Sequence, residues 1–196
     1  MAETIDLGPA ARAMTELLNG VRDDGLAQPT PCAEYTLGDL IDHIGGLAVG
    51  FAKAAAKDPA VAEGGGSGDA SRLGADWRPR IAAQLDQLVE AWRKPDAWSG
   101  TTRIAGMELP GEVAGRIALN ELVVHGWDVA IASGQPFTAD DATLGPCLEF
   151  LEMSAAQAEQ TGQRGPFGTP VPVPDDAPRI DRLIGLAGRN PAWPGA

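Results

Sequence analysis

Residues 111–133 read GEVAGRIALNELVVHGWDVAIAS and form the most apolar helical stretch of the chain. When these residues are placed about 100° apart around a helix, apolar side chains point in every direction. A helix that is apolar on all sides is normally one that other helices bury. We therefore expect a central helix here, with Glu121 and His125 inside the protein, one turn apart and with adjacent side chains.

The same periodicity predicts further helices on both sides of this one. Pro29 and Pro31 prevent the first helix from continuing. Thr36, with Asp39 three residues later, is a variant of the capping box and predicts the start of the next helix. Helices with mostly short connections predict an all-α fold, an antiparallel four-helix bundle. The expected helices cover residues 7–25, 36–57, 76–92, 111–133, 140–160 and 180–187.

Three stretches do not follow the helical pattern. We expect residues 95–110 to form a short irregular insertion that is extended at residues 101–104. The glycine-rich residues 64–68 predict a flexible loop. Residues 165–196 predict a proline-rich, extended tail that closes with a short helix. Because a chain of 196 residues suits one domain with a sizeable core, we predict a single domain over residues 1–196.

Composition excludes several classes of partner. The chain has 15 Lys and Arg against 27 Asp and Glu, a formal net charge of −12. Such a surface repels phosphate backbones and anionic lipids, so we expect neither nucleic acid nor membrane as a partner. The acidic N-terminus does not resemble a secretory signal, and two cysteines do not make a disulfide framework. These features predict a cytoplasmic protein and leave its oligomeric state open.

The two histidines of the chain, His43 and His125, indicate where its chemistry lies. Burying Glu121 and His125 without partners would cost several kcal/mol. A divalent cation would offset that cost, and His43, at the margin of the apolar stripe of helix 36–57, would supply a third ligand. Two histidines and one carboxylate, with positions left for water or substrate, are the composition of a catalytic zinc site or a related divalent site.

Spacing alone does not choose between this site and simpler interpretations. A glutamate and a histidine one turn apart are also typical of an ion pair. His43 and Glu121 are 78 positions apart, a gap that only the fold can close. Gly46 and Gly50 lie on the same side of their helix as His43 and would leave room there for a bound molecule.

Two other residues near the candidate ligands have alternative interpretations. Asp128 lies one turn beyond His125 and would accept the free ring N–H of a metal-bound histidine. It could equally pair with an arginine or point to water. We interpret Cys32 as a small buried hydrophobic residue rather than a nucleophile, because no general base is visibly placed for it.

Two stretches of the sequence resemble a known family. Residues 30–43, TPCAEYTLGDLIDH, and residues 121–128, ELVVHGWD, are similar to the motifs of the mycothiol-dependent maleylpyruvate isomerase N-terminal domain family, a branch of the DinB-like metalloenzyme superfamily. Residues 172–178 and 186–193 resemble the tail of an actinobacterial subgroup without the isomerase's C-terminal domain. Tyr35 stands where the family usually has Trp. Without that domain, we do not expect maleylpyruvate isomerisation itself.

The resemblance implies a DinB-like four-helix core with a metal bound by His43, Glu121 and His125. The family metal is usually zinc, with nickel, manganese or cobalt as alternatives. It implies mycothiol as thiol cosubstrate and a small electrophile as second substrate, in S-transfer or isomerisation. A bound zinc ion deprotonates a coordinating thiol, and the thiolate is the nucleophile. Two alternatives from other classes stay open: a metal-dependent hydrolase, and a non-catalytic metal-binding protein.

Overall fold

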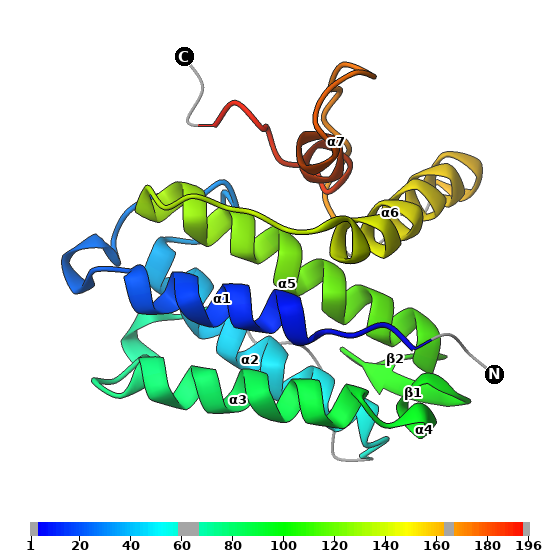
Figure 1. The fold of residues 1–196 in the computed structure, drawn as a ribbon, viewed down its shortest axis with the longest axis horizontal. Coiled ribbons are helices and arrows are strands. Elements are labelled where there is room, and N and C mark those ends of the chain that lie inside the picture. Colours follow the sequence, from blue (N-terminus) through cyan, green and yellow to red (C-terminus); the bar gives the residue numbers. More distant parts are fainter. Residues whose placement is uncertain (1–3, 59–66, 163–166, 194–196) are drawn as a thin grey trace. The chain divides into compact units, whose positions relative to one another are not determined.

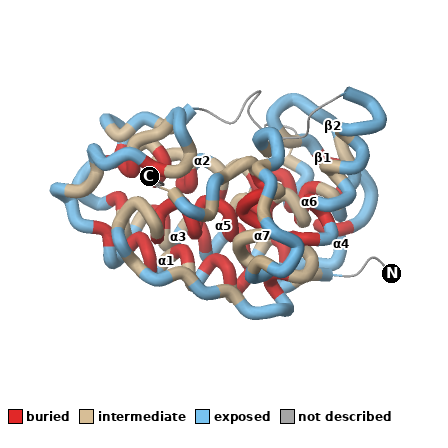
Figure 2. The backbone as a smooth tube through the Cα atoms, turned by 90° about the horizontal axis from the view of Figure 1, so that it is seen from above, coloured by how far each residue is buried: buried red, intermediate tan, exposed pale blue. Residues whose placement is uncertain are grey.

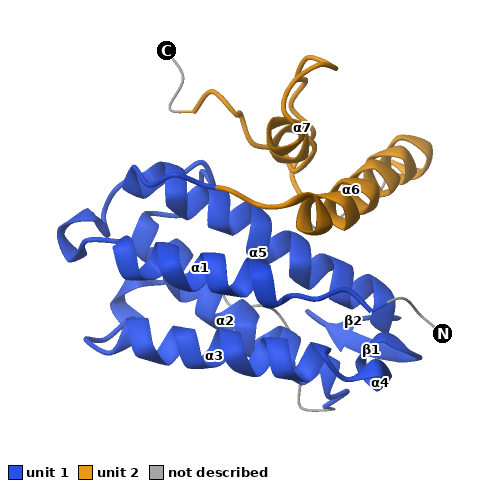
Figure 3. Cartoon of the chain, viewed as in Figure 1, with its two compact units in different colours: residues 1–137 blue, residues 138–196 orange. Residues whose placement is uncertain are grey.

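The computed structural model describes residues 4–58, 67–162 and 167–193. The chain divides into two compact units, residues 1–137 (unit 1) and residues 138–196 (unit 2), which Figure 3 colours separately. Each unit is described by itself below. That the whole chain forms a single domain stays a prediction.

Unit 1 is built from four long helices, and α1 and α2 each pack against both α3 and α5 (Figure 1). The chain begins α2 with the predicted capping box, because Thr36 Oγ1 accepts from Asp39 N–H and Asp39 Oδ2 accepts from Thr36 N–H. The buried segments, red in Figure 2, belong largely to these helices. The prediction of a mostly helical fold is therefore confirmed. The four helices are α1 (Gly8–Gly20), α2 (Leu37–Ala55), α3 (Trp77–Trp92) and α5 (Gly111–Ser133).

The directions of the four helices depart from the expected antiparallel order. Trp92 Nε1 donates to Phe51 O at 3.1 Å, so the C-terminal ends of α3 and α2 lie together and the two helices run parallel. Gln135, just after α5, donates to Leu17 O near the end of α1, so α5 and α1 also run parallel. The connection between α2 and α3 spans residues 56–76. That length lets the chain return to the start of α2, which short connections would not allow.

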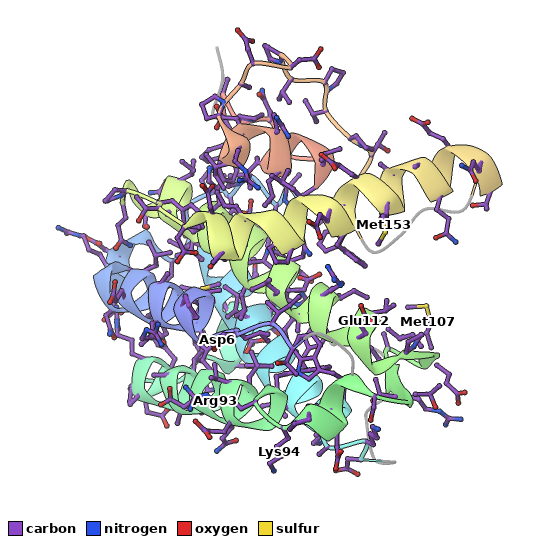
Figure 4. All side chains as sticks on the ribbon, turned by 45° about the vertical axis from the view of Figure 1, so that its right-hand side comes forward. Asp6, Arg93, Lys94, Met107, Glu112 and Met153 are labelled. Carbon is purple, nitrogen blue, oxygen red and sulfur yellow. The ribbon has the colours of Figure 1, made fainter. Side chains whose placement is uncertain are left out.

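A β-hairpin lies between α3 and α5 and corrects the all-α prediction. Strands β1 (Thr101–Ile104) and β2 (Met107–Pro110) pair antiparallel, with Thr101 opposite Pro110 and Ile104 opposite Met107. A two-residue turn joins them, with φ of 50° at Ala105 and 78° at Gly106. Met107 is exposed on the hairpin (Figure 4). The short helix α4 (Pro95–Trp98) precedes β1.

The remaining described elements of unit 1 are two 3-10 turns, Asp23–Gly25 and Ala70–Arg72. Residues 64–66 of the predicted glycine-rich loop lie outside the described residues. Gly68, from the same loop, is described, and its backbone lies directly against α2. A glycine predicted to give flexibility therefore permits a close packing contact.

Unit 2 contains α6 (Asp141–Thr161) and α7 (Arg179–Leu186), which pack against each other. An extended proline-rich segment follows α6, and Val171 N–H donates to Gly185 O of α7 at 2.8 Å. The two predicted helices and this part of the predicted tail are present; residues 165 and 166 lie outside the described residues. Cys147 is fully buried on α6.

None of the helices in the described ranges is long and apolar enough to cross a membrane.

Candidate metal centre

Helix α5 brings three polar side chains to one buried face. Glu121 Oε2 lies 2.9 Å from His125 Nε2, and Asp128 Oδ2 lies 3.0 Å from His125 Nδ1. His125 is 5% exposed and Asp128 0%. The helical spacing explains the arrangement, since residues three and four positions apart face one another. Each ring nitrogen of His125 therefore faces a carboxylate.

These contacts control the protonation of His125. Burial disfavours the charged ring and lowers its pKa, but the hydrogen bonds with Asp128 and Glu121 outweigh this and raise the pKa to about 9. In the metal-free protein at neutral pH, His125 is thus an imidazolium that donates to both carboxylates. A cation at Nε2 would replace the proton shared with Glu121, while Nδ1–H would remain bonded to Asp128.

Of the alternatives that the sequence leaves open for Asp128, the structure shows the contact with the ring of His125. Its carboxylate accepts from the ring of His125, in a position with no exposure to solvent. In metal sites such a carboxylate fixes the tautomer and the orientation of the ligand histidine. That Asp128 does so for a bound metal stays a prediction.

The side chain of His43, on α2, lies beside Glu121 and His125. The ring centroids of His43 and His125 are 5.3 Å apart, with an interplanar angle of 86°. His43, Glu121 and His125 each offer a ligand atom within 4.8 Å of the other two. The packing of α2 on α5 therefore closes the gap of 78 positions between His43 and Glu121. Two imidazoles and a carboxylate suit a divalent cation in kind, and three ligands would leave positions open.

The surroundings of His43 are partly aromatic and partly open. The ring of Tyr35 lies 5.1 Å from that of His43, at an angle of 39°. Thr30 Oγ1 donates to Tyr35 O, and this hydrogen bond stabilises the turn that precedes α2. A Cβ built on Gly46 or Gly50 would meet no atom of the described residues beyond the backbone of its own helix within 4 Å. This agrees with the expectation that the two glycines leave room beside His43.

Cys32 lies in a place that the sequence did not predict. It is half-buried, and its Sγ belongs to a second group of potential ligands with His125 and Asp128, again within 4.8 Å of one another. The two groups share His125, which faces Glu121 through one ring nitrogen and Asp128 through the other. Because Cys32 and His125 are 93 positions apart, no sequence spacing could have indicated this contact.

Comparison with known proteins gives the family. The sequence model of one protein family, described as the mycothiol maleylpyruvate isomerase N-terminal domain, matches residues 7–130. These residues include nearly all of α1 to α5 and every candidate ligand. The chain belongs to this family. The resemblance seen in its motifs is therefore confirmed.

The chain is also similar to an uncharacterized protein and to a solved structure. An uncharacterized protein of Mycobacterium tuberculosis, found in two strains, is 31% identical over 191 residues, covering 92% of this chain and 94% of the relative. A crystal structure of a histidine-to-alanine mutant of the mycothiol-dependent maleylpyruvate isomerase matches 80% of this chain and 69% of its own, with a TM-score of 0.59. At 17% sequence identity, that likeness shows a shared fold.

Proposed function

We propose that His43, Glu121 and His125 bind one divalent cation and that the protein uses it in the chemistry of a low-molecular-weight thiol. The proposed reaction is a mycothiol-dependent S-transfer to a small electrophile, or its isomerisation. One observation carries the proposal: three ligand side chains from α2 and α5 lie within 4.8 Å of one another in a chain of the mycothiol maleylpyruvate isomerase family.

The chemistry of the ligand set supports a catalytic rather than a purely structural metal. Structural zinc sites are normally closed by four protein ligands, whereas catalytic sites keep a position open. A bound divalent cation would lower the pKa of a coordinating thiol and so supply the thiolate nucleophile. We propose zinc as the native metal, with nickel, manganese and cobalt as alternatives that the same ligands accept.

The protein's own residues would prepare this site in three ways. Asp128 holds the Nδ1–H of His125, which leaves Nε2 to bind the cation. Glu121 brings a negative charge that compensates part of the cation's charge. The open side of α2 at Gly46 and Gly50 gives the thiol and the electrophile a place to bind beside His43.

Cobalt substitution tests the proposal directly. When mycothiol is added to the cobalt-loaded protein, we expect a sulfur-to-metal charge-transfer band in the near ultraviolet. The band should grow as pH rises, because a thiol coordinates in its deprotonated form. It should be absent from His125→Ala, and an analogue with oxygen in place of sulfur should not produce it.

Cys32 requires a matched control, because its own sulfur lies near His125. In Cys32→Ser, the band that depends on mycothiol should remain. If instead a band is present without added thiol and Cys32→Ser removes it, Cys32 is a ligand and the proposed set is wrong.

The other function classes predict different outcomes. If no thiol changes the cobalt spectrum and the protein hydrolyses an ester or amide without thiol, it is a metal-dependent hydrolase. If the metal is bound but neither thiol nor substrate affects it, the protein is a non-catalytic metal-binding protein.

A further inference from the structure

The backbone of Gly68 lies unusually close to α2 at the position of His43. A Cβ built on Gly68 would lie 2.0 Å from the carbonyl oxygen of Asp39 and 3.1 Å from Cβ of His43. The first distance is far below any real contact, and the obstacle is helix backbone that cannot turn aside. Only glycine permits such an approach. Gly68 therefore serves a close contact with the turn of α2 that begins at Asp39 and carries His43.

The residues that follow Gly68 are attached to the same turn by polar contacts. Asp69 N–H donates to Asp42 Oδ2 at 3.1 Å, and Ala70 N–H donates to Asp39 Oδ1 at 2.9 Å. Arg72 Nη2 lies 2.6 Å from Asp42 Oδ2, and the side chain of Asp42 is only 12% exposed. These contacts span 27 to 31 positions of sequence, so they hold two separate parts of the chain together.

His43 and the other two candidate ligands lie on different helices. Glu121 and His125 lie on one helix and hold each other through a contact of 2.9 Å. His43 comes from α2, and its ring lies 5.1 Å from that of Tyr35 and 5.3 Å from that of His125. The position of its imidazole therefore depends on how the first half of α2 is held.

We propose that residues 67–73, seated on α2 through Gly68, position His43 for metal binding. Gly68 is a positioning residue: its missing side chain lets the segment lie against α2 without displacing Asp39 or His43. The Asp42–Arg72 ion pair and the two backbone hydrogen bonds then hold the segment there. This inference rests on the proposed function, because it assigns a role to the segment in the proposed metal site.

The main test compares two glycine substitutions. Gly68→Ala pushes a methyl group against the backbone of α2, whereas Gly25→Ala adds one outside the proposed site, where it meets no described atom within 4 Å beyond its own neighbours in the chain. We expect Gly68→Ala to weaken metal binding roughly 10–100-fold, the size usual for loss of a group that orients a ligand. Gly25→Ala should leave metal affinity unchanged. Affinity is measured by competition with a chelator, and the visible spectrum of the cobalt form reports ligand geometry.

A second variant covers the case in which Gly68→Ala does not fold. Asp42→Asn weakens the attachment of Arg72 without adding bulk, and we expect a smaller loss of metal affinity in the same direction, with the thermal transition of the metal-free protein retained. If Asp42→Asn, or a folded Gly68→Ala, binds metal with the affinity and cobalt spectrum of the wild type, the positioning role is refuted.

NMR spectra of the metal-free protein test the positioning of His43 independently of metal binding. Because the chain has two histidines, their ring signals can be assigned in NMR spectra of the metal-free protein. If the wild type binds no metal, the proposed function fails, and the ring signals alone decide the positioning. A Gly68→Ala variant that shifts or broadens the His43 signal and leaves that of His125 unchanged supports it. Unchanged signals from both rings refute it.

Discussion

The candidate site has two sides that are built in different ways. On the α5 side, Glu121, His125 and Asp128 are neighbours in one helix, so local geometry alone brings them together. On the α2 side, the turn that carries His43 is held through Asp39 and Asp42 by hydrogen bonds from Ala70 and Asp69, which lie about 30 positions further along the chain. Helix α5 thus brings two candidate ligands, Glu121 and His125, together with Asp128 by local geometry alone, whereas the tertiary fold must bring the third candidate ligand, His43, to them.

The largest expected difference between the two sides is the response to loss of each histidine. His125→Ala should abolish metal binding and also destabilise the metal-free protein by about 3–5 kcal/mol, because it removes the imidazole that contacts the buried carboxylate of Asp128. His43→Ala should lose the metal but cost less than about 1 kcal/mol, since its side chain is only half-buried. Elemental analysis and urea unfolding measure both. Equal destabilisation by the two variants would contradict the division into two sides.

The α5 side should also give the metal-free protein a dependence on alkaline pH. The pKa of His125 is raised from 6.5 to about 9 in the folded protein, so the stability that its charge contributes is fully present below pH 6.5. It should be lost as pH rises through about 9, to the extent of a few kcal/mol. Urea unfolding between pH 6 and 10, with chelator present, checks this. A profile that is flat in the wild type would show that His125 is neutral in the folded protein.

Asp128→Asn tests whether the carboxylate of Asp128 orients the ring of His125 for metal binding. We expect metal affinity to fall roughly 10–100-fold without unfolding, because the amide no longer accepts the Nδ1–H as a carboxylate does. Chelator competition measures the affinity, and circular dichroism checks the fold. Unchanged affinity would mean that Asp128 does not orient the ligand.

The smallest expected effect lies on the α2 side, at acidic pH. The hydrogen bonds from Thr36 and from Ala70 N–H lower the pKa of Asp39 below its usual 3.8. Its contribution to stability is therefore present above pH 3.8 and lost as pH falls through the lower value in the folded protein. Asp39→Asn should be less stable than the wild type at pH 6, and the difference should shrink towards pH 2. A difference that does not change with pH would assign the effect to packing.

The sequence could predict the features that depend on neighbours within one helix. The all-round apolar pattern of residues 111–133 predicts the burial of His125, which is 5% exposed, whereas Glu121, predicted to lie inside as well, is only half-buried. The Thr36–Asp39 capping box is present as predicted. It did not predict the parallel course of α2 and α3, because the length of residues 56–76 permits either direction. It also did not predict the hairpin, since the turn at Ala105 and Gly106 lacks the usual Asn-Gly signal.

The sequence does not predict the features of the site that depend on contacts between residues far apart in the chain, because spacing in sequence does not determine these contacts. His43 is predicted as the third candidate ligand because the chain has only one other histidine, and the motif resemblance supports it, whereas spacing cannot connect it with Glu121 and His125. The partner of Asp128 depended on side-chain geometry, and three alternatives fitted its position equally well. The sequence predicts a core residue at Cys32 and a loop residue at Gly68, because nothing near them in sequence shows that they lie beside His125 and His43.

X-ray absorption spectroscopy of the purified protein at the edge of its bound metal is the most direct test of the central claim, that α2 and α5 jointly hold one catalytic cation. We predict close to one metal per chain, scattering from two imidazoles, and no sulfur neighbour in the protein without thiol. Added mycothiol should then contribute one sulfur at about 2.3 Å if the metal is zinc. Absence of metal, scattering from a single imidazole, or a sulfur neighbour that disappears in Cys32→Ser would contradict the account.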